Sequence, residues 1–157
     1  MAFQFNEENI TLINEECKKY PEKKPVVMFA LYRGQEQNGY ISKDVMDEVA
    51  KVLEMDAEDV YGVVSFYTMY HTKPIGKYHL QVCTNVSCML RGGYDIMEQV
   101  KQITGINNGE VSSDMKFSIE EVECMGSCGT APMIAVNEDF HENLNTDKVK
   151  EIIQTLK

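Results

Sequence analysis

Two stretches decide the fold of this 157-residue chain: Lys77–Cys88, KYHLQVCTNVSC, and Phe117–Cys128, FSIEEVECMGSC. Apolar and polar residues alternate in the first half of the first stretch, which is the pattern of a half-buried β-strand. The second stretch begins with Phe117, Ile119 and Val122 and predicts another strand. Each predicted strand runs into a pair of cysteines. If the two strands are neighbours in one sheet, both cysteine loops leave the same edge and the thiols can converge.

The remainder of the second half predicts a small α/β sheet covered by helices. Residues 94–103 carry apolar side chains at helical spacing, and 133–136 form a short apolar run that ends in the turn-like sequence Asn137-Glu138-Asp139. Thr146 is placed to cap a last helix. The expected order of elements is therefore β-α-β-β-(β)-α.

The first part of the chain has a helical pattern instead. Apolar side chains recur three or four residues apart, so its short helices are expected to pack as a small bundle. The period changes near residues 71–76, and we therefore expect a helical bundle over 1–73 and an α/β domain over 74–157. The expected helices run from Asn6 to Tyr20, from near Pro25 to before Asn38-Gly39, from the cap Ser42 through Leu53, and from Asp56 through Tyr67.

The cysteines of the two loops have the spacing of metal ligands. Four residues separate Cys83 from Cys88, and three separate Cys124 from Cys128. A 2Fe–2S cluster takes four thiolates, two per iron, so each loop can serve one iron. A structural zinc ion also takes four cysteines at such spacing. The pattern is a strong indication of a metal, and it leaves iron–sulfur and zinc open.

Three glycines beside these loops are candidate supporting positions for a bound cluster. Gly92 follows the first cysteine pair, Gly126 lies within the second pair and Gly129 follows it. Glycine lets the backbone approach closely, so amide N–H groups can point at sulfur. Hydrogen bonds of this kind stabilise the negative charge added on reduction and raise the reduction potential.

Other kinds of site fit the sequence less well. A thiol–disulfide enzyme would use C-x-x-C, which this sequence lacks. A Rieske centre needs two histidine ligands, but His71, His79 and His141 stand outside the cysteine loops. Cys17 lies on the apolar face of the first expected helix and is expected in the core. Neither a G-x-G-x-x-G nor a P-loop pattern is present, so we predict no catalytic residues and no NADH oxidation by this chain alone.

The composition narrows the class of protein. The formal net charge of −10 argues against a nucleic-acid partner, because phosphates need a basic surface. No apolar run approaches the ~20 residues that cross a bilayer, and residues 1–8 lack the pattern of a secretory signal, so we expect a cytoplasmic protein without direct membrane insertion. Stable disulfides would be reduced there, which favours metal binding for the cysteines.

Two cysteine motifs, VCTNVSCMLRG at residues 82–92 and VECMGSCGTAP at 122–132, resemble the thioredoxin-like 2Fe–2S subunit of respiratory complex I. In bacteria this family is the E subunit of NADH–quinone oxidoreductase. The segments VYGVVSFY at 60–67 and ENLNT at 142–146 are similar to the family as well. The same module also resembles small subunits of NAD-linked formate dehydrogenases and of multimeric hydrogenases.

This resemblance implies a thioredoxin-like 2Fe–2S ferredoxin domain behind an N-terminal helical bundle, within the α+β or α/β class. It implies one 2Fe–2S cluster on Cys83, Cys88, Cys124 and Cys128 that exchanges single electrons with FMN of a partner flavoprotein, which also binds NADH. The chain would then be an electron-transfer subunit of a larger multi-subunit redox complex, held at the inner face of the membrane through that complex. The alternative of another class is a zinc-stapled docking module.

Two structural details follow from these interpretations. Thioredoxin-like folds often place a cis proline just before a strand, where this sequence has Ala131-Pro132. Obligate docking on a partner would leave an exposed apolar patch on the helical bundle.

Overall fold

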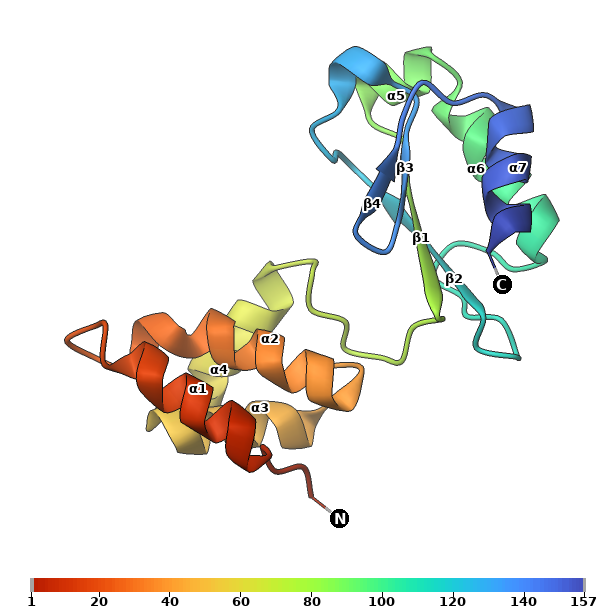
Figure 1. Cartoon of the computed structure of the whole chain (residues 1–157). Coiled ribbons are helices and arrows are strands. Elements are labelled where there is room, and N and C mark those ends of the chain that lie inside the picture. The colour runs from red at the N-terminus through yellow and green to blue at the C-terminus, as the bar shows by residue number, and fades with distance from the viewer. Residues whose placement is uncertain (1, 157) are drawn as a thin grey trace. The chain divides into compact units, whose positions relative to one another are not determined.

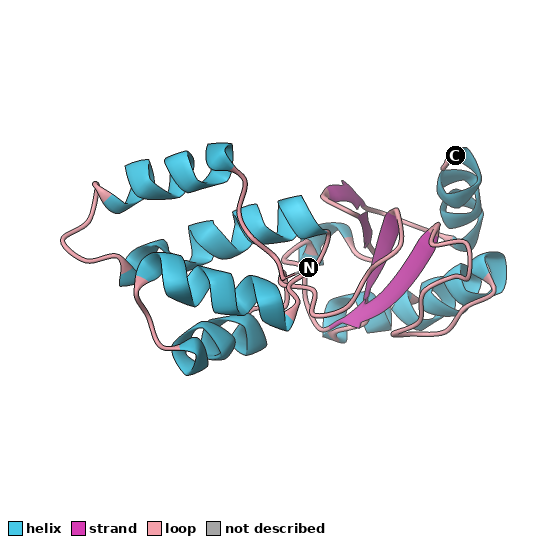
Figure 2. Ribbon diagram, turned by 90° about the horizontal axis from the view of Figure 1, so that it is seen from below, coloured by secondary structure: helices cyan, strands magenta, loops and turns pink. Residues whose placement is uncertain are grey.

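The computed structural model describes residues 2–156, and the chain divides into two compact units between Pro74 and Ile75. In the described part of the first unit the regular elements are all helices, whereas the second unit combines a sheet with helices (Figure 1). Figure 2 shows the same contrast by secondary structure, with the strands confined to the second unit. The expected fold class, a helical bundle followed by a mixed α/β domain, is confirmed.

Local capping explains where the helices of the first unit begin and end. The Asn6 side chain accepts a hydrogen bond of 2.8 Å from a first-turn amide, and Ser42 does the same at 3.3 Å, which confirms the predicted cap. Gly39 ends a helix with a left-handed φ of 84°. The first helix ends before the expected Tyr20, because the chain tightens into turns after Cys17. The helices are α1 (Glu7–Cys17), η1 (Lys24–Val26), α2 (Val27–Asn38), α3 (Lys43–Leu53) and α4 (Ala57–Phe66).

The apolar stripes of these helices meet in one core. Fully or almost fully buried side chains come from each α-helix, and Cys17 packs half-buried against them, as expected of a core cysteine. Helix α4 departs from this pattern, because Tyr61 is 61% exposed and Phe66 is 77% exposed. The helical unit therefore presents large aromatic side chains to solvent. The core includes Ile13, Leu31, Val45, Val49, Leu53 and Val60.

The second unit is built on a four-stranded sheet in the order β2-β1-β3-β4. Strands β1 and β2 are parallel, and β3 pairs with β1 in the antiparallel direction, as does β4 with β3. The strands are β1 (Tyr78–Cys83), β2 (Phe117–Val122), β3 (Ile134–Val136) and β4 (Asp139–His141), and the helices are α5 (Val86–Leu90), α6 (Gly93–Thr104), η2 (Cys128–Thr130) and α7 (Thr146–Thr155).

Helices α6 and α7 lie side by side against the sheet (Figure 1). Their apolar residues Val100 and Val149 are fully buried in one core with Leu80 and Val82 of β1. Successive side chains of a strand point to opposite faces, so this packing accounts for the alternation in the sequence of β1. The site residues then lie at the end of the strand, where the core stops.

The structure of this unit differs from the sequence-based predictions in two details and confirms a third. Asn145, not Thr146, caps α7: its side chain accepts from the Lys148 amide at 2.9 Å, and Thr146 is the first helical residue. Helix α5 was not expected. The peptide bond Ala131-Pro132 is cis, as the resemblance implied.

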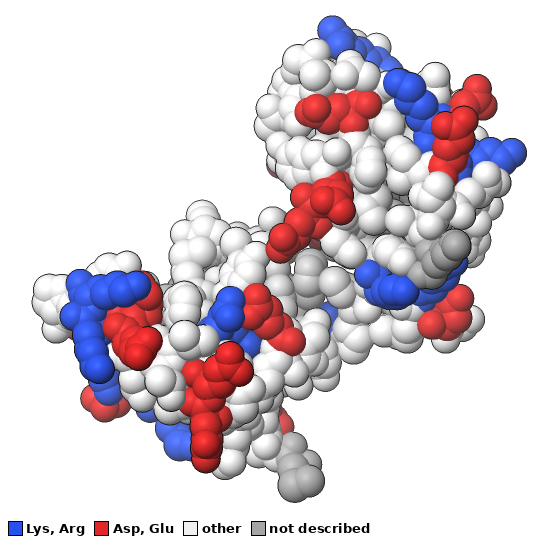
Figure 3. Space-filling view, in the orientation of Figure 1, with Lys and Arg blue, Asp and Glu red and all other residues white. Residues whose placement is uncertain are grey.

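The surface is charged and mixed in sign. Figure 3 shows acidic and basic side chains interspersed on the visible face of each unit. Several of them form ion pairs along one helix, such as Lys19 Nζ with Glu16 Oε2 at 2.6 Å. Within residues 2–156, no helix is both long enough and apolar enough to cross a bilayer.

Candidate metal centre

The parallel pairing of β1 and β2 brings the two cysteine loops to one edge of the sheet. In the register, Cys83 at the end of β1 lies opposite Val122 at the end of β2. The next amide, Thr84 N–H, still donates to Val122 O at 3.2 Å. The prediction that the two strands are neighbours is therefore confirmed, and both loops start from the same place.

The first loop is short, buried and helical. Asn85 accepts from the amide of Val86 at 2.6 Å and caps α5, which carries Cys88. Cys83 and Cys88 are only 4% and 2% exposed. Two predicted ligands are therefore shielded from solvent.

The second glycine of Gly92-Gly93, the two residues that follow the first cysteine pair, closes this loop. A Cβ on Gly93 would lie 2.9 Å from the carbonyl carbon and oxygen of Cys88 and 3.0 Å from the carbonyl oxygen of Cys83. The first residue of α6 can thus pack onto both cysteines only without a side chain. Gly92, the predicted supporting position, has a left-handed φ of 92° and precedes α6. The signal in the sequence was the double glycine.

The second loop is exposed and open. Cys124 and Cys128 both face solvent. Gly126 has a left-handed φ of 83°, and its amide donates to Cys124 Sγ at 3.4 Å. This is the kind of amide-to-sulfur hydrogen bond that was expected of a glycine here. Gly129 lies in η2 with open space around it and donates no hydrogen bond to sulfur among the contacts of the described residues.

Hydrogen bonds join the two loops to each other. Ser87 Oγ, in α5, donates to the carbonyl oxygen of Cys128 at 2.9 Å. The Cys83 thiol donates to Glu123 O at 3.7 Å, just before Cys124. The buried loop and the exposed loop therefore form one connected structure.

The thiols contact one another in two pairs. Burial raises the pKa of the Cys88 thiol to about 11, and a hydrogen bond with Cys83 adds to the rise. A hydrogen bond with Cys124 is the main cause that raises the pKa of the Cys128 thiol, and the nearby Cys83 adds to it. Because thiolates are the ligand form, a metal that binds here must displace these protons.

The donor set fits a two-iron cluster. The thiol contacts join Cys83 with Cys88 and Cys124 with Cys128, one pair on each loop. A 2Fe–2S cluster is held by two thiolates on each of two irons, so this paired arrangement matches its ligand requirement.

The histidines have other surroundings. His79 is buried on β1, with Nδ1 2.8 Å from Ser118 Oγ and Nε2 3.0 Å from Glu120 Oε2. Because successive side chains of a strand point to opposite faces of the sheet, His79 lies on the face opposite to the apolar core that contains Leu80 and Val82. Both ring nitrogens are thus engaged with β2, and His79 offers no ligand to the cysteine loops.

Comparison with known proteins places this arrangement in a family. Residues 13–157, which span both units, match the family model described as thioredoxin-like [2Fe-2S] ferredoxin. The E subunit of an NADH-quinone oxidoreductase from Rickettsia bellii is 41% identical over 99% of this chain and 95% of its own length. An E subunit of the same kind of oxidoreductase from Rhizobium meliloti is 36% identical over 92% of this chain and 86% of its own.

Solved structures are similar in fold. An NAD+-reducing [NiFe]-hydrogenase in the H2-reduced state matches with a TM-score of 0.73 over 85% of this chain, at 16% identity. This chain spans 22% of the length of that hydrogenase chain. The air-oxidised state matches with a TM-score of 0.70.

Proposed function

The chain belongs to the thioredoxin-like [2Fe–2S] ferredoxin family, and we propose that it is the one-electron carrier subunit of an NADH-oxidising complex of the complex I type. Its cofactor is one 2Fe–2S cluster. The observation that carries the proposal is the parallel β1–β2 pair, which brings two pairs of thiols to one edge of the sheet. The E subunits of NADH-quinone oxidoreductases are near 40% identical to this chain over almost its whole length, and they support a complex of the same kind.

In this proposal Cys83 and Cys88 hold one iron, and Cys124 and Cys128 hold the other. The bound cluster supplies a carrier for single electrons. The protein shields one side, because the first cysteine pair is buried, and opens the other, because the second pair faces solvent. The Gly126 amide donates to Cys124 Sγ and stabilises negative charge on that sulfur. Gly92 and Gly129 are proposed as further supporting backbone positions.

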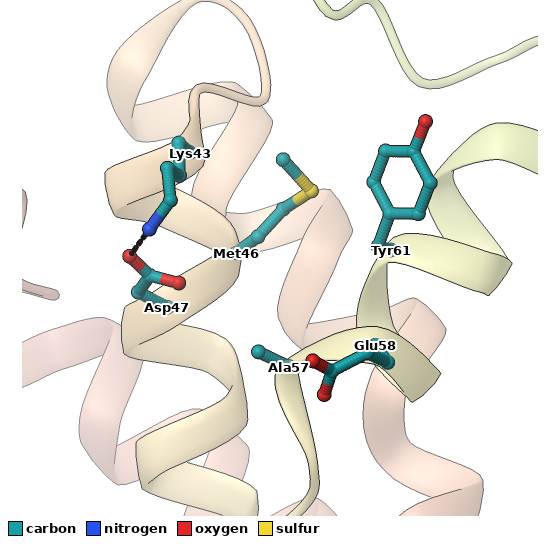
Figure 4. A pocket seen from close by; sticks show the side chains of 6 residues that line it. All are labelled: Lys43, Met46, Asp47, Ala57, Glu58 and Tyr61. Atoms are coloured by element: carbon teal, nitrogen blue, oxygen red, sulfur yellow. Dashed lines mark hydrogen bonds and ion pairs between the residues drawn. The ribbon is translucent and has the colours of Figure 1, made fainter.

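The partner is a flavoprotein that binds FMN and NADH, inside a larger redox complex. Exposed apolar side chains on both units support docking onto another protein, since Phe66 on α4 and Leu90 on α5 are 77% and 78% exposed. The helical unit also has an apolar hollow of about 490 Å³ between α3 and α4, where Met46 faces Tyr61 and a Lys43–Asp47 ion pair lies at the rim (Figure 4). We place the protein in the cytoplasm, at the inner face of the membrane through its complex.

The same module could serve a hydrogenase or an NAD-linked formate dehydrogenase. The hydrogenase likeness, at 16% identity, concerns the fold, whereas the relatives near 40% identity carry the name NADH-quinone oxidoreductase. The relatives therefore favour the complex I setting. Metal analysis distinguishes both settings from a zinc-stapled docking module, which would be colourless and redox-silent.

Electron exchange is tested with the flavoprotein partner from the same organism. The two chains are co-expressed, purified without oxygen and treated with NADH, and the reduced cluster is followed by EPR. We expect the signal with NADH only when the flavoprotein is present, and with dithionite in either sample. A cluster that dithionite reduces but NADH plus flavoprotein does not would overturn the proposed relay.

A further inference from the structure

The segment after β4 lies alongside the second cysteine loop. Asn143 N–H donates to Thr130 O at 2.7 Å, and Leu144 N–H donates to Pro132 O at 3.1 Å. These two backbone hydrogen bonds fix the segment against the residues that follow Cys128. The Leu144 side chain is buried in the core of the second unit, so the segment is anchored to the rest of the fold.

The side chain of Glu142 extends this contact towards Cys128. Its Oε1 accepts a hydrogen bond of 2.6 Å from Thr130 Oγ1. Hydrogen bonding with Thr130, the larger cause, and with Ser127 holds the pKa of Glu142 below its ordinary value. Thr130 follows Cys128 by two positions, so the Glu142 carboxylate binds the loop directly after a predicted ligand.

Apolar packing holds this loop at Met125, which lies half-buried against Cys83, Cys88, Ala131 and Met133, but it does not reach Cys128. A Cβ at Gly126 or at Gly129 would meet nothing within 4 Å, and Cys124 and Cys128 are exposed. The two glycines also increase the conformational entropy that this loop loses when it folds. From the other side, only the bond from Ser87 Oγ reaches the backbone of Cys128 among the side-chain hydrogen bonds of the described residues. On the Cys128 side of the loop, hydrogen bonds therefore supplement the apolar contact made by Met125.

We propose that Glu142 is a positioning residue for the cluster: its carboxylate, hydrogen-bonded to Thr130, holds Cys128 in the ligand-binding conformation and adds a negative charge beside the metal site. The inference rests on the proposed function for the cluster itself. Two effects follow. Loss of the hydrogen bonds loosens the loop, and loss of the charge makes reduction of the cluster easier, which raises its potential.

The test uses Glu142→Ala, which removes both effects, and Glu142→Gln, which keeps an acceptor oxygen but removes the charge. The matched control is Glu138→Ala, an exposed carboxylate of the same unit in the turn after β3. We expect cluster loss to a chelator to be roughly threefold faster in Glu142→Ala, the size of an exposed charge-assisted contact. Glu142→Gln should restore most of the retention while its reduction potential stays above that of the wild-type protein. Glu138→Ala should match the wild type in both.

Thr130→Val supplies an independent check, because it removes the same hydrogen bond from the other partner. Its effect on cluster retention should not add to that of Glu142→Ala, since both remove one interaction. Additive losses of cluster retention in the double variant would contradict the proposed role of the Glu142–Thr130 hydrogen bond. So would a Glu142→Ala protein that behaves as the Glu138→Ala control does in retention and potential.

Amide hydrogen exchange in the metal-free full chain separates this inference from the proposed function. We expect faster exchange at residues 128–130 in Glu142→Ala than in Glu138→Ala. If the wild-type chain holds no cluster, the proposed function is wrong. If residues 128–130 exchange equally fast in Glu142→Ala and Glu138→Ala, the positioning role of Glu142 is wrong, whether or not the chain holds a cluster. A Glu142→Ala chain that fails to fold is replaced by Glu142→Gln and Thr130→Val, which keep the volume of each side chain.

Discussion

Replacing Gly93 by alanine should distort the first cysteine loop and destabilise the second unit. The added Cβ would lie 2.9 Å from the carbonyl carbon and oxygen of Cys88 and 3.0 Å from the carbonyl oxygen of Cys83. Favourable contacts between carbon atoms lie at about 3.5–4.0 Å, so the backbone would have to move by about half an ångström or more. The atoms that must move belong to two predicted ligands, and no flexible side chain can yield in their place.

The magnitude follows from other overpacked cores. Forced overpacking costs about 1–3 kcal/mol in the free energy of unfolding. For a unit of this size, about 2 kcal/mol corresponds to a fall in Tm of roughly 8–16 °C. We expect this fall in calorimetry of the full chain, together with a much lower iron content after anaerobic purification.

Gly129→Ala is the matched control. A Cβ there would meet nothing within 4 Å, and the residue lies in the other cysteine loop. Its free energy of unfolding should change by less than about 0.5 kcal/mol, as for other unconstrained surface positions. Equal melting temperatures for Gly93→Ala and Gly129→Ala would refute the argument that close backbone approach shapes the first loop.

Four further substitutions test the ligands, the helical core and a buried tyrosine. Cys83→Ser and Cys124→Ser should each disturb cluster assembly, and an unchanged iron content and visible spectrum would count against those ligands. Ile13→Ala, in the core of the helical unit, should lower the free energy of unfolding by about 2–5 kcal/mol in denaturant titration. A loss below about 1 kcal/mol would contradict the burial of Ile13 in this core. Burial raises the pKa of Tyr70 to about 12, above its unfolded value near 10, so the folded state holds this proton more tightly. The stability gained is complete below pH 10 and is lost as pH rises towards 12, and Tyr70→Phe should make this loss smaller in alkaline melting curves; an identical loss would remove Tyr70 as its source.

Local patterns of the sequence predict most of the fold. The alternation in β1 and the cysteines just past each strand are properties of neighbouring residues, so they indicate where the loops emerge before any tertiary contact is known. The capping of α3 by Ser42 is local in the same way. The cap of α7 was assigned wrongly because Asn145 and Thr146 are both good caps, and only backbone geometry decides between them.

The missed features depend on length or on tertiary contact. Helix α5 spans Val86–Leu90, too few residues for a helical period to show, although Asn85 was an available capping signal. The tight fit of Gly93 involves the carbonyl groups of two cysteines that lie earlier in the chain. Glu142 reaches Thr130 across twelve positions of sequence, and a local pattern carries no sign of that contact.

Metal and sulfide analysis together with EPR tests whether the four cysteines hold a 2Fe–2S cluster. The full chain is purified without oxygen and examined before and after reduction. We expect about two irons and two acid-labile sulfides per chain, and an EPR signal that appears only after reduction. One zinc per chain, no acid-labile sulfide and a featureless visible spectrum would contradict it.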